Sequence, residues 1–227
     1  MNKFLIINLL WAVLIWVGDC LYLQTGALLA KGLTSAAFVL MGVTNLIYLI
    51  CQKHRDYRFP ATMLVGLGFA MLGDIVLNLH FIAGAVLFAL GHVCFFVAYC
   101  LAQPFHWTDL IYGAVILVPA GLFILLAPMF DFGGVLMQVV CVVYATIISL
   151  MVGKAIANLV RAKDTQSLLV MMGSILFLFS DLMLLINVFS AAPRIFDVLC
   201  LATYYPAEAI LAFTIWGSHQ KEKEVSK

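Results

Sequence analysis

Long apolar stretches follow one another along almost the whole chain and leave few residues between them. A helix needs about 20 apolar residues to cross the hydrocarbon core of a bilayer. Stretches of that length lie at 4–22, 33–51, 61–79, 82–103, 109–127, 134–157, 167–189 and 196–217. The chain is 65% hydrophobic and only 10% charged, which is more apolar surface than one water-soluble core can bury. We therefore expect an all-α, polytopic membrane helical bundle of about eight transmembrane helices, forming a single integral membrane domain over residues 1–227.

Lysine and arginine are distributed unevenly between the two ends of these predicted helices. Only Lys31 and Arg194 fall on one side of the bundle. The residues on the other side are Lys3, Lys53, Arg55, Arg58, Lys154, Arg161, Lys163, Lys221, Lys223 and Lys227. Basic loops of membrane proteins stay in the cytoplasm. We therefore expect both termini to be cytoplasmic, and the short loops favour a bacterial inner membrane.

Two aspartates lie inside long apolar stretches, where a charged group is costly. Asp74 and Asp181 each follow a glycine by eight residues, Gly66 and Gly173 respectively. An ionisable group in hydrocarbon costs roughly 2.5–3.5 kcal/mol even on the milder scales, so its presence indicates a function. The predicted orientation places both carboxylates roughly 8–12 Å below the outer boundary, at 1.5 Å per residue. We expect them to be the catalytic pair.

Other polar residues are predicted to gather near the same level and to bind substrate. They are Asn78, Tyr204, Tyr205, Glu208, His92 and Lys31. Residues three or four apart share a helix face, which places Asn78 beside Asp74 and both tyrosines beside Glu208. Lys31, expected just before the second predicted helix, could meet a lipid phosphate or only extend its amine to the interface. The tyrosines could be packing residues, and Glu208 could be neutralised by Lys31 or a tyrosine. The cytoplasmic halves offer fewer polar candidates, chiefly Asn45 and Asn158.

The two glycine-to-aspartate segments are four predicted helices apart and run in the same direction. The chain could therefore be a parallel repeat of four plus four helices, an arrangement seen in membrane folds.

Several function classes find no support in the sequence. The net charge of +1 excludes a basic surface for nucleic acid. The five histidines form no HxxxH or HExxH pair, so no metal site and no cofactor are expected. The serines form no GxSxG motif. The six cysteines are scattered singly and are most simply packing residues.

Two carboxylates in a partly dry pocket suit acid–base hydrolysis. Burial and mutual repulsion keep a proton on one carboxyl while the other stays ionised and activates water. Bonds that break through an oxocarbenium-like cation are cleaved in this way. The structural alternative is a pair of hydrogen bonds that lock neighbouring helices, although such bonds contribute little in membranes.

Four segments together resemble the YhhN-like membrane proteins, the lysoplasmalogenase family. They are GLGFAMLGDIVLN around Asp74, LFALGHVCFFVAY around His92, GSILFLFSDLMLLIN around Asp181 and ATYYPAEAIL around Glu208. The resemblance implies an eight-helix hydrolase that cleaves the vinyl ether bond of lysoplasmalogens to a fatty aldehyde and glycerophosphoethanolamine or glycerophosphocholine. It also implies dependence on intramembrane aspartates, which match Asp74 and Asp181. At Glu208 the family is expected to carry glutamine, which argues against a catalytic role for this carboxyl.

The expected partners are a lysophospholipid substrate and membrane lipids, and a homodimer is left open. The headgroup of the natural substrate, and which aspartate is the acid, are not determined by the sequence, although Asp181 is expected to lie deeper and is favoured. The alternative is a proton-coupled transporter of a small molecule or lipid that uses the same aspartates. Discontinuous helices and a second polar layer on the cytoplasmic side would favour transport. A third alternative is a purely structural membrane protein, which would need both acids to be paired without solvent access.

Overall fold

The chain forms eight antiparallel helices in the computed structural model, which describes residues 3–225 and the side chains of residues 4–218. The helices are α1 (Lys3–Thr25), α2 (Leu28–Cys51), α3 (Arg58–Leu77), α4 (Phe81–Ala102), α5 (Asp109–Leu126), α6 (Val135–Ala162), α7 (Thr165–Phe189) and α8 (Ile195–Val225). Each of the eight is long and apolar enough to cross a membrane. The predicted polytopic helical bundle is confirmed, and the protein is an integral multi-pass membrane protein.

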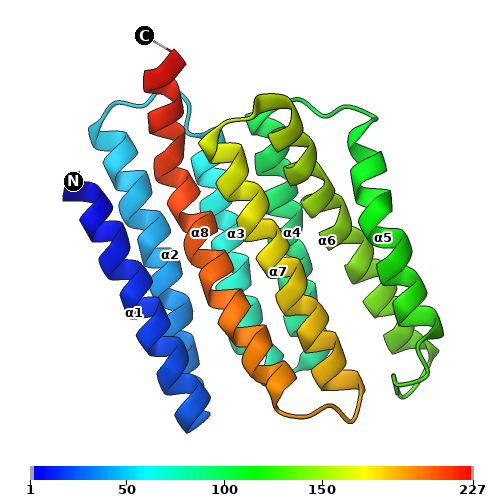
Figure 1. The fold of residues 1–227 in the computed structure, drawn as a ribbon. Coiled ribbons are helices and arrows are strands. Elements are labelled where there is room, and N and C mark those ends of the chain that lie inside the picture. Colours follow the sequence, from blue (N-terminus) through cyan, green and yellow to red (C-terminus); the bar gives the residue numbers. More distant parts are fainter. Residues whose placement is uncertain (1–2, 226–227) are drawn as a thin grey trace.

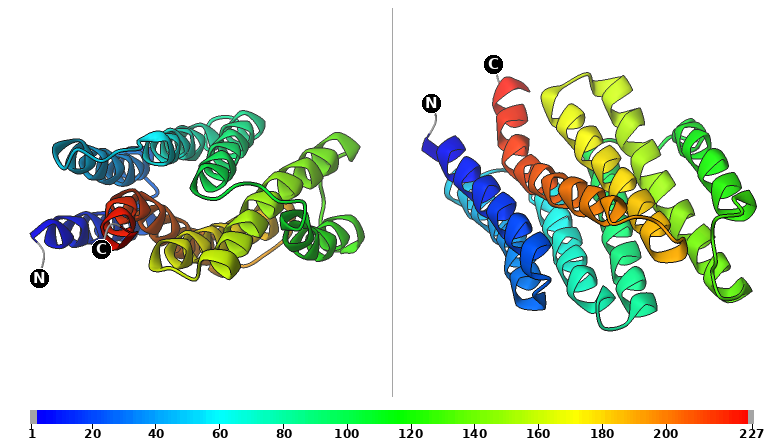
Figure 2. Two further views of the ribbon diagram at one scale, coloured as in Figure 1. Left: turned by 90° about the horizontal axis from the view of Figure 1, so that it is seen from above. Right: turned by 60° about the horizontal axis from the view of Figure 1, so that its bottom comes forward.

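The helices are arranged in two rows. Seen from above in Figure 2, α2, α3 and α4 form one row, and α1, α8 and α7 form the other. The remaining helices, α6 and α5, close one end, and α5 packs mainly against α6, while its Phe123 and Ile124 side chains also reach the apolar side chains of α7. Both termini lie at the upper end of the bundle in Figure 1, and the loops after α1, α3, α5 and α7 lie at the lower end.

The basic residues also divide between the two ends of the bundle. The loops that carry Lys53, Arg55 and Lys163 join helices at the same end as the termini. Lys31 and Arg194 lie near the opposite end. Of the other residues in the orientation argument, the side chains of Lys3, Lys221 and Lys223, and all of Lys227, lie outside the described part of the chain. Cytoplasmic termini therefore stay a prediction of the positive-inside rule.

Most helix contacts of the two halves correspond to each other, although α1 and α3 pack on α8 whereas no Cα atom of α5 or α7 lies within 8 Å of a Cα atom of α4 in the described chain. Sequential helices pack together within each half, and α2 packs on α8 as α6 packs on α4. The paired glycines also act alike, since a Cβ at Gly66 would overlap the ring of Phe95 on α4. A Cβ at Gly173 would lie 2.9 Å from Leu211 on α8. Each glycine thus lets the next helix approach closely, as a parallel repeat of four plus four helices would require.

The α5–α6 pair depends on another close approach, which gives a testable expectation. A Cβ at Gly153 would overlap the backbone of Gly113, and backbone atoms cannot move aside as a flexible side chain can. We expect Gly153→Ala to lower the free energy of unfolding by about 1–3 kcal/mol through overpacking. The measurement is unfolding of the purified protein in detergent. The control is Gly121→Ala in α5, where no atom lies within 4 Å of the added Cβ and alanine is the better helix former. Equal stability of the two variants would contradict this account of the contact.

Candidate functional site

A cavity of about 220 Å³ lies between the helices toward the end of the bundle away from the termini. We call it the polar cavity. The residues that line it are Tyr22, Lys31, Asp74, Leu77, Asn78, Phe81, Phe88, Ser180, Asp181, Leu184, Asn187, Val188, Asp197, Cys200, Leu201 and Tyr204. Asp74 and Asp181, which are 107 positions apart in the sequence, therefore line one cavity. The fold therefore brings the two carboxyl groups to one site, as the sequence predicts.

Asp74 is buried in α3 and is held by three donors from two other helices. The ammonium of Lys31 on α2 lies 3.0 Å from Asp74 Oδ1. On the other oxygen, Ser35 of α2 donates a hydrogen bond to Oδ2, and Tyr205 of α8 donates a second at 3.0 Å. Hydrogen bonds and ion pairs of a carboxyl group with charged or hydroxyl donors are strong, so these three contacts hold the Asp74 side chain in one orientation.

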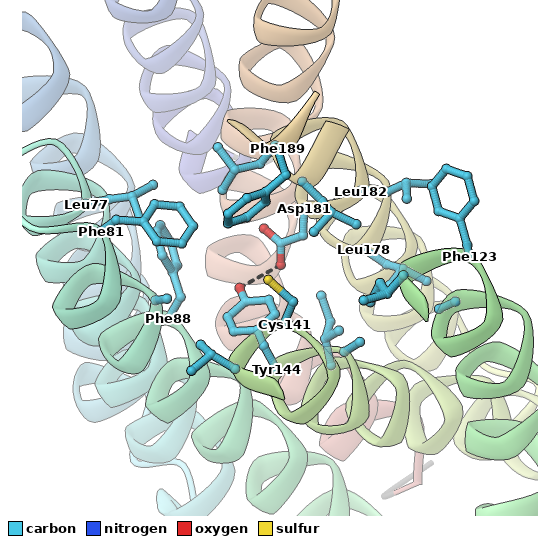
Figure 3. Close-up of a pocket in the computed structure, with 18 residues that line it drawn as sticks. Leu77, Phe81, Phe88, Phe123, Cys141, Tyr144, Leu178, Asp181, Leu182 and Phe189 are labelled. Atoms are coloured by element: carbon cyan, nitrogen blue, oxygen red, sulfur yellow. Dashed lines mark hydrogen bonds between the residues drawn. The ribbon is translucent and has the colours of Figure 1, made fainter. Parts of the chain in front are cut away.

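Asp181 has a different environment on α7. The hydroxyl of Tyr144 on α6 donates a hydrogen bond of 2.8 Å to Asp181 Oδ2, as Figure 3 shows. The ring Nε2 of His92 on α4 lies 3.2 Å from the same oxygen and 2.9 Å from the Tyr144 hydroxyl. Neither lysine nor arginine pairs with Asp181 in the described chain. Asp181 thus differs from Asp74 in lacking a permanent cation.

The two aspartates occupy equivalent places in the two halves. Asp74 on α3 is contacted by side chains of α2 and α8, and Asp181 on α7 is contacted by side chains of α6 and α4. The helix pairs correspond under the four-plus-four repeat, whereas the partner residues do not. The two sites differ in Lys31, because the described residues of the second half place no lysine or arginine beside Asp181.

The other predicted binding residues divide into two groups. Lys31, Asn78 and Tyr204 line the polar cavity. His92 and Tyr205 are fully buried behind it, and each hydrogen-bonds one of the aspartates. We infer that these two residues position the carboxylates. Asn78 donates to the backbone oxygen of Asp74 at 2.7 Å and so acts on the helix end.

Lys31 lies deeper than the sequence suggested. The prediction placed it just before the second helix, but α2 begins at Leu28, so Lys31 falls in the first helical turn. Its side chain is 8% exposed, and its ammonium pairs with Asp74. The expectation that the amine reaches the interface is therefore wrong, because the buried carboxylate attracts it inward.

Glu208 lies outside the lining of the polar cavity. It is fully buried in α8, and neither carboxyl oxygen has a hydrogen-bond partner. The suggestion that Lys31 neutralises Glu208 is excluded by the Lys31–Asp74 pair. An unpaired charge in such a site is very costly, so burial favours a neutral, protonated carboxyl here. Its assignment to substrate binding stays a prediction.

Several residues of the site escaped sequence analysis. Ser35 follows Lys31 by one helical turn, a spacing that could have indicated a shared partner. Tyr144 lies in an apolar stretch without any polar neighbour that would have singled it out. Asp197, in the first turn of α8, adds a third carboxylate to the polar cavity. The cavity thus carries three acidic side chains and one lysine, which suits a ligand with a positive charge.

A second polar cluster at the opposite end was also missed. Asp109 at the start of α5 pairs with Arg161 and, at 2.9 Å, with the fully buried Lys154 of α6. Lys154 also donates a hydrogen bond to the carbonyl oxygen of Pro104. The prediction that the cytoplasmic half holds few polar candidates is therefore wrong. The prediction counts Lys154, which lies inside the 134–157 stretch, only as a basic residue at the cytoplasmic end and not as a polar group of the bundle interior.

Among the described residues, no group of three or more His, Cys, Asp or Glu side chains could hold a metal ion.

The model of one protein family, the YhhN family, matches residues 27–215 of the chain. The match begins in the loop before α2 and reaches the second half of α8, so it includes every residue that lines the polar cavity except Tyr22. Neither the curated proteins nor the solved structures gave a significant match.

Proposed function

Because the chain belongs to the YhhN family, we propose that it is a membrane-embedded hydrolase that cleaves the vinyl ether bond of a lysoplasmalogen or a related lysolipid. The observation that carries this proposal is the pairing of two unlike carboxyl groups, Asp74 and Asp181, in one cavity. One group faces a lysine and the other does not. Two carboxyls whose environments differ in this way divide into an acid and an ionised partner.

Asp181 is the proposed acid. Its carboxyl transfers a proton to the vinyl carbon that is not bonded to oxygen, which leaves an oxocarbenium ion and an Asp181 carboxylate. Tyr144 and His92 hold the carboxyl in place and stabilise the negative charge that forms. The sequence also favours Asp181 as the acid, because Asp181 is expected to lie deeper in the membrane than Asp74. A chemical reason supports the same choice, since no lysine or arginine pairs with Asp181 in the described chain.

Asp74 is the proposed ionised partner. Its carboxylate stabilises the oxocarbenium ion and accepts a proton from the water that attacks it. The resulting hemiacetal collapses to a fatty aldehyde and a glycerol hydroxyl, and the proton gained from water returns to Asp181 through the cavity. Lys31, Ser35 and Tyr205 keep the Asp74 carboxylate fixed without taking part in the bond changes.

The charge of the polar cavity bears on the substrate headgroup. Asp197 lines the cavity beside the two aspartates, and Lys31 is the only cation there. An excess of carboxylates favours a ligand with an ammonium group, as in ethanolamine and choline lysophospholipids. With the termini in the cytoplasm, the headgroup would lie at the outer membrane surface.

The Asp109–Lys154–Arg161 cluster favours a second candidate, a proton-coupled transporter, because it adds a polar layer at the other end. Each charge in that cluster is already paired. The helices of the described chain also run through the membrane without interruption at the aspartates. Hydrolysis is therefore the better supported of the two.

The test is aldehyde release from a lysoplasmalogen by purified protein in detergent, with a diacyl phospholipid as the control substrate. We expect release of aldehyde from the lysoplasmalogen alone. A well-folded protein that releases no aldehyde from vinyl ether lysolipids of either headgroup would rule out the proposed reaction.

A further inference from the structure

A second cavity, of about 100 Å³, adjoins the polar cavity, and the proposed bond changes leave its apolar lining without a role. We call it the apolar cavity. The residues that line it are Leu77, Phe81, Ala85, Phe88, Ala120, Phe123, Ile124, Val140, Cys141, Tyr144, Ala145, Ile148, Leu178, Asp181, Leu182, Leu184, Leu185 and Phe189. Asp181 is the only ionisable carboxyl among them, and nearly all the others are hydrocarbon (Figure 3). A cavity of this kind suits an aliphatic chain.

The two cavities share part of their walls. Leu77, Phe81, Phe88, Asp181 and Leu184 line both. Asp181 therefore stands at the junction between a hydrocarbon compartment and a polar one. In a single-chain lipid the bond between the aliphatic chain and the polar head lies at the same kind of junction.

The apolar cavity also lies beside a gap in the helix packing. Phe81 and Phe88 of α4 lie on one side of the close-up in Figure 3, and Phe123 of α5 lies on the other. In the described chain α4 and α5 each pack on α6, and no Cα atom of α4 lies within 8 Å of a Cα atom of α5. A lipid chain can therefore pass between these two helices from the bilayer without separating a packed pair.

We propose that the apolar cavity binds the single hydrocarbon chain of a lysolipid, which enters between α4 and α5 and places its polar linkage at Asp181. A cavity of about 100 Å³ has no room for two chains side by side, so it selects against lipids with two chains. The identification of the chain as the alkenyl chain of a lysoplasmalogen rests on the proposed function. The binding site itself does not, because an alkyl lysolipid that cannot be hydrolysed fits the same features.

The first test is independent of catalysis. A lysophosphatidylethanolamine with an alkyl ether chain, carrying a diazirine at the chain end, is photolysed with the full-length protein in detergent. We expect mass spectrometry to find the label in α5 and α6, within residues 120–124 and 140–148. Labelling confined to lipid-facing residues such as Val115 and Val118, or to α1 and α2, would overturn the proposal.

The second test fills the cavity and follows chain-length selectivity. Ala120→Phe places a ring in the apolar cavity from α5, and Ala85→Leu narrows it from α4. For each, we expect kcat/KM for a hexadecenyl substrate to fall roughly tenfold relative to that for an octenyl substrate. The matched control is Val118→Phe, since Val118 is exposed on the same helix and does not line the cavity.

The outcomes separate the two proposals. Selective loss of the long chain in Ala120→Phe or Ala85→Leu supports the chain site, and an unchanged ratio in both folded variants overturns it. If the parent releases no aldehyde from any substrate, the proposed reaction fails, and the diazirine label alone then decides on the chain site. If one of the two variants does not fold, the other, which fills the cavity from the opposite wall, decides the test.

Discussion

Asp181→Asn is expected to lower kcat for aldehyde release roughly 10²–10⁴-fold, the range that general acid catalysis contributes. Asparagine preserves the shape of the side chain and can still accept the Tyr144 hydrogen bond, but it has no carboxyl proton to transfer to carbon. Because no lysine or arginine among the described side chains pairs with Asp181, its replacement leaves none of those buried cations without a partner. The variant should therefore fold like the parent, with lysolipid binding preserved.

The equivalent test of Asp74 needs a double substitution. Asp74→Asn alone would leave the Lys31 ammonium buried without its counterion, and stability would fall together with activity. The double variant Asp74→Asn, Lys31→Met removes both charges and keeps a similar volume. We expect this double variant to fold and to lose activity to a similar extent as Asp181→Asn.

The control for both is Asp56→Asn, which removes an exposed carboxylate from the loop before α3. Full activity in this control, together with the two losses, is the expected pattern. If a folded Asp181→Asn protein keeps a rate within about threefold of the parent, well below the contribution of a general acid, then Asp181 is not the acid.

Lys154→Met is expected to lower the free energy of unfolding by about 3 kcal/mol, at the lower end of the range for breaking a buried pair. Lys154 is fully buried and is bonded to both Asp109 and the Pro104 carbonyl oxygen. Its removal leaves Asp109 partly unpaired, although Arg161 remains to offset some of the loss. The measurement is unfolding in detergent or bicelles, compared with the parent.

The matched control for Lys154→Met is Arg58→Met, which removes the cation of an exposed ion pair with Asp56. Solvent screens such a pair, so we expect little change in unfolding. Both variants should keep full aldehyde release below their unfolding temperatures, because the Asp109 cluster lies at the end of the bundle away from the polar cavity. Loss of activity in a stable Lys154→Met protein would instead assign that cluster a role in function and would favour transport.

The helices were predictable from the sequence because a bilayer imposes a minimum length of apolar chain. The eight predicted stretches correspond one to one with the eight helices, and most differences are at the ends. The largest are at the start of α2 and at the ends of α6 and α8, where each helix continues past the apolar stretch, and at α2 the extension takes in Lys31. Local composition places a charged residue outside the membrane, whereas a partner on another helix can draw it inside.

The sequence by itself determined that this is a bundle of membrane helices with two costly aspartates in equivalent segments, because hydrocarbon penalises charge wherever the residue lies in the fold. Only the tertiary structure decided which groups meet those aspartates. Lys31 could have paired with lipid, Glu208 or Asp74, and the packing of α2 against α3 selects Asp74. Tyr144 reaches Asp181 for the same reason, since α6 packs against α7. Side-chain partners across helices depend on rotation and tilt, which apolar spacing does not specify, and these contacts make the two carboxyl groups unlike.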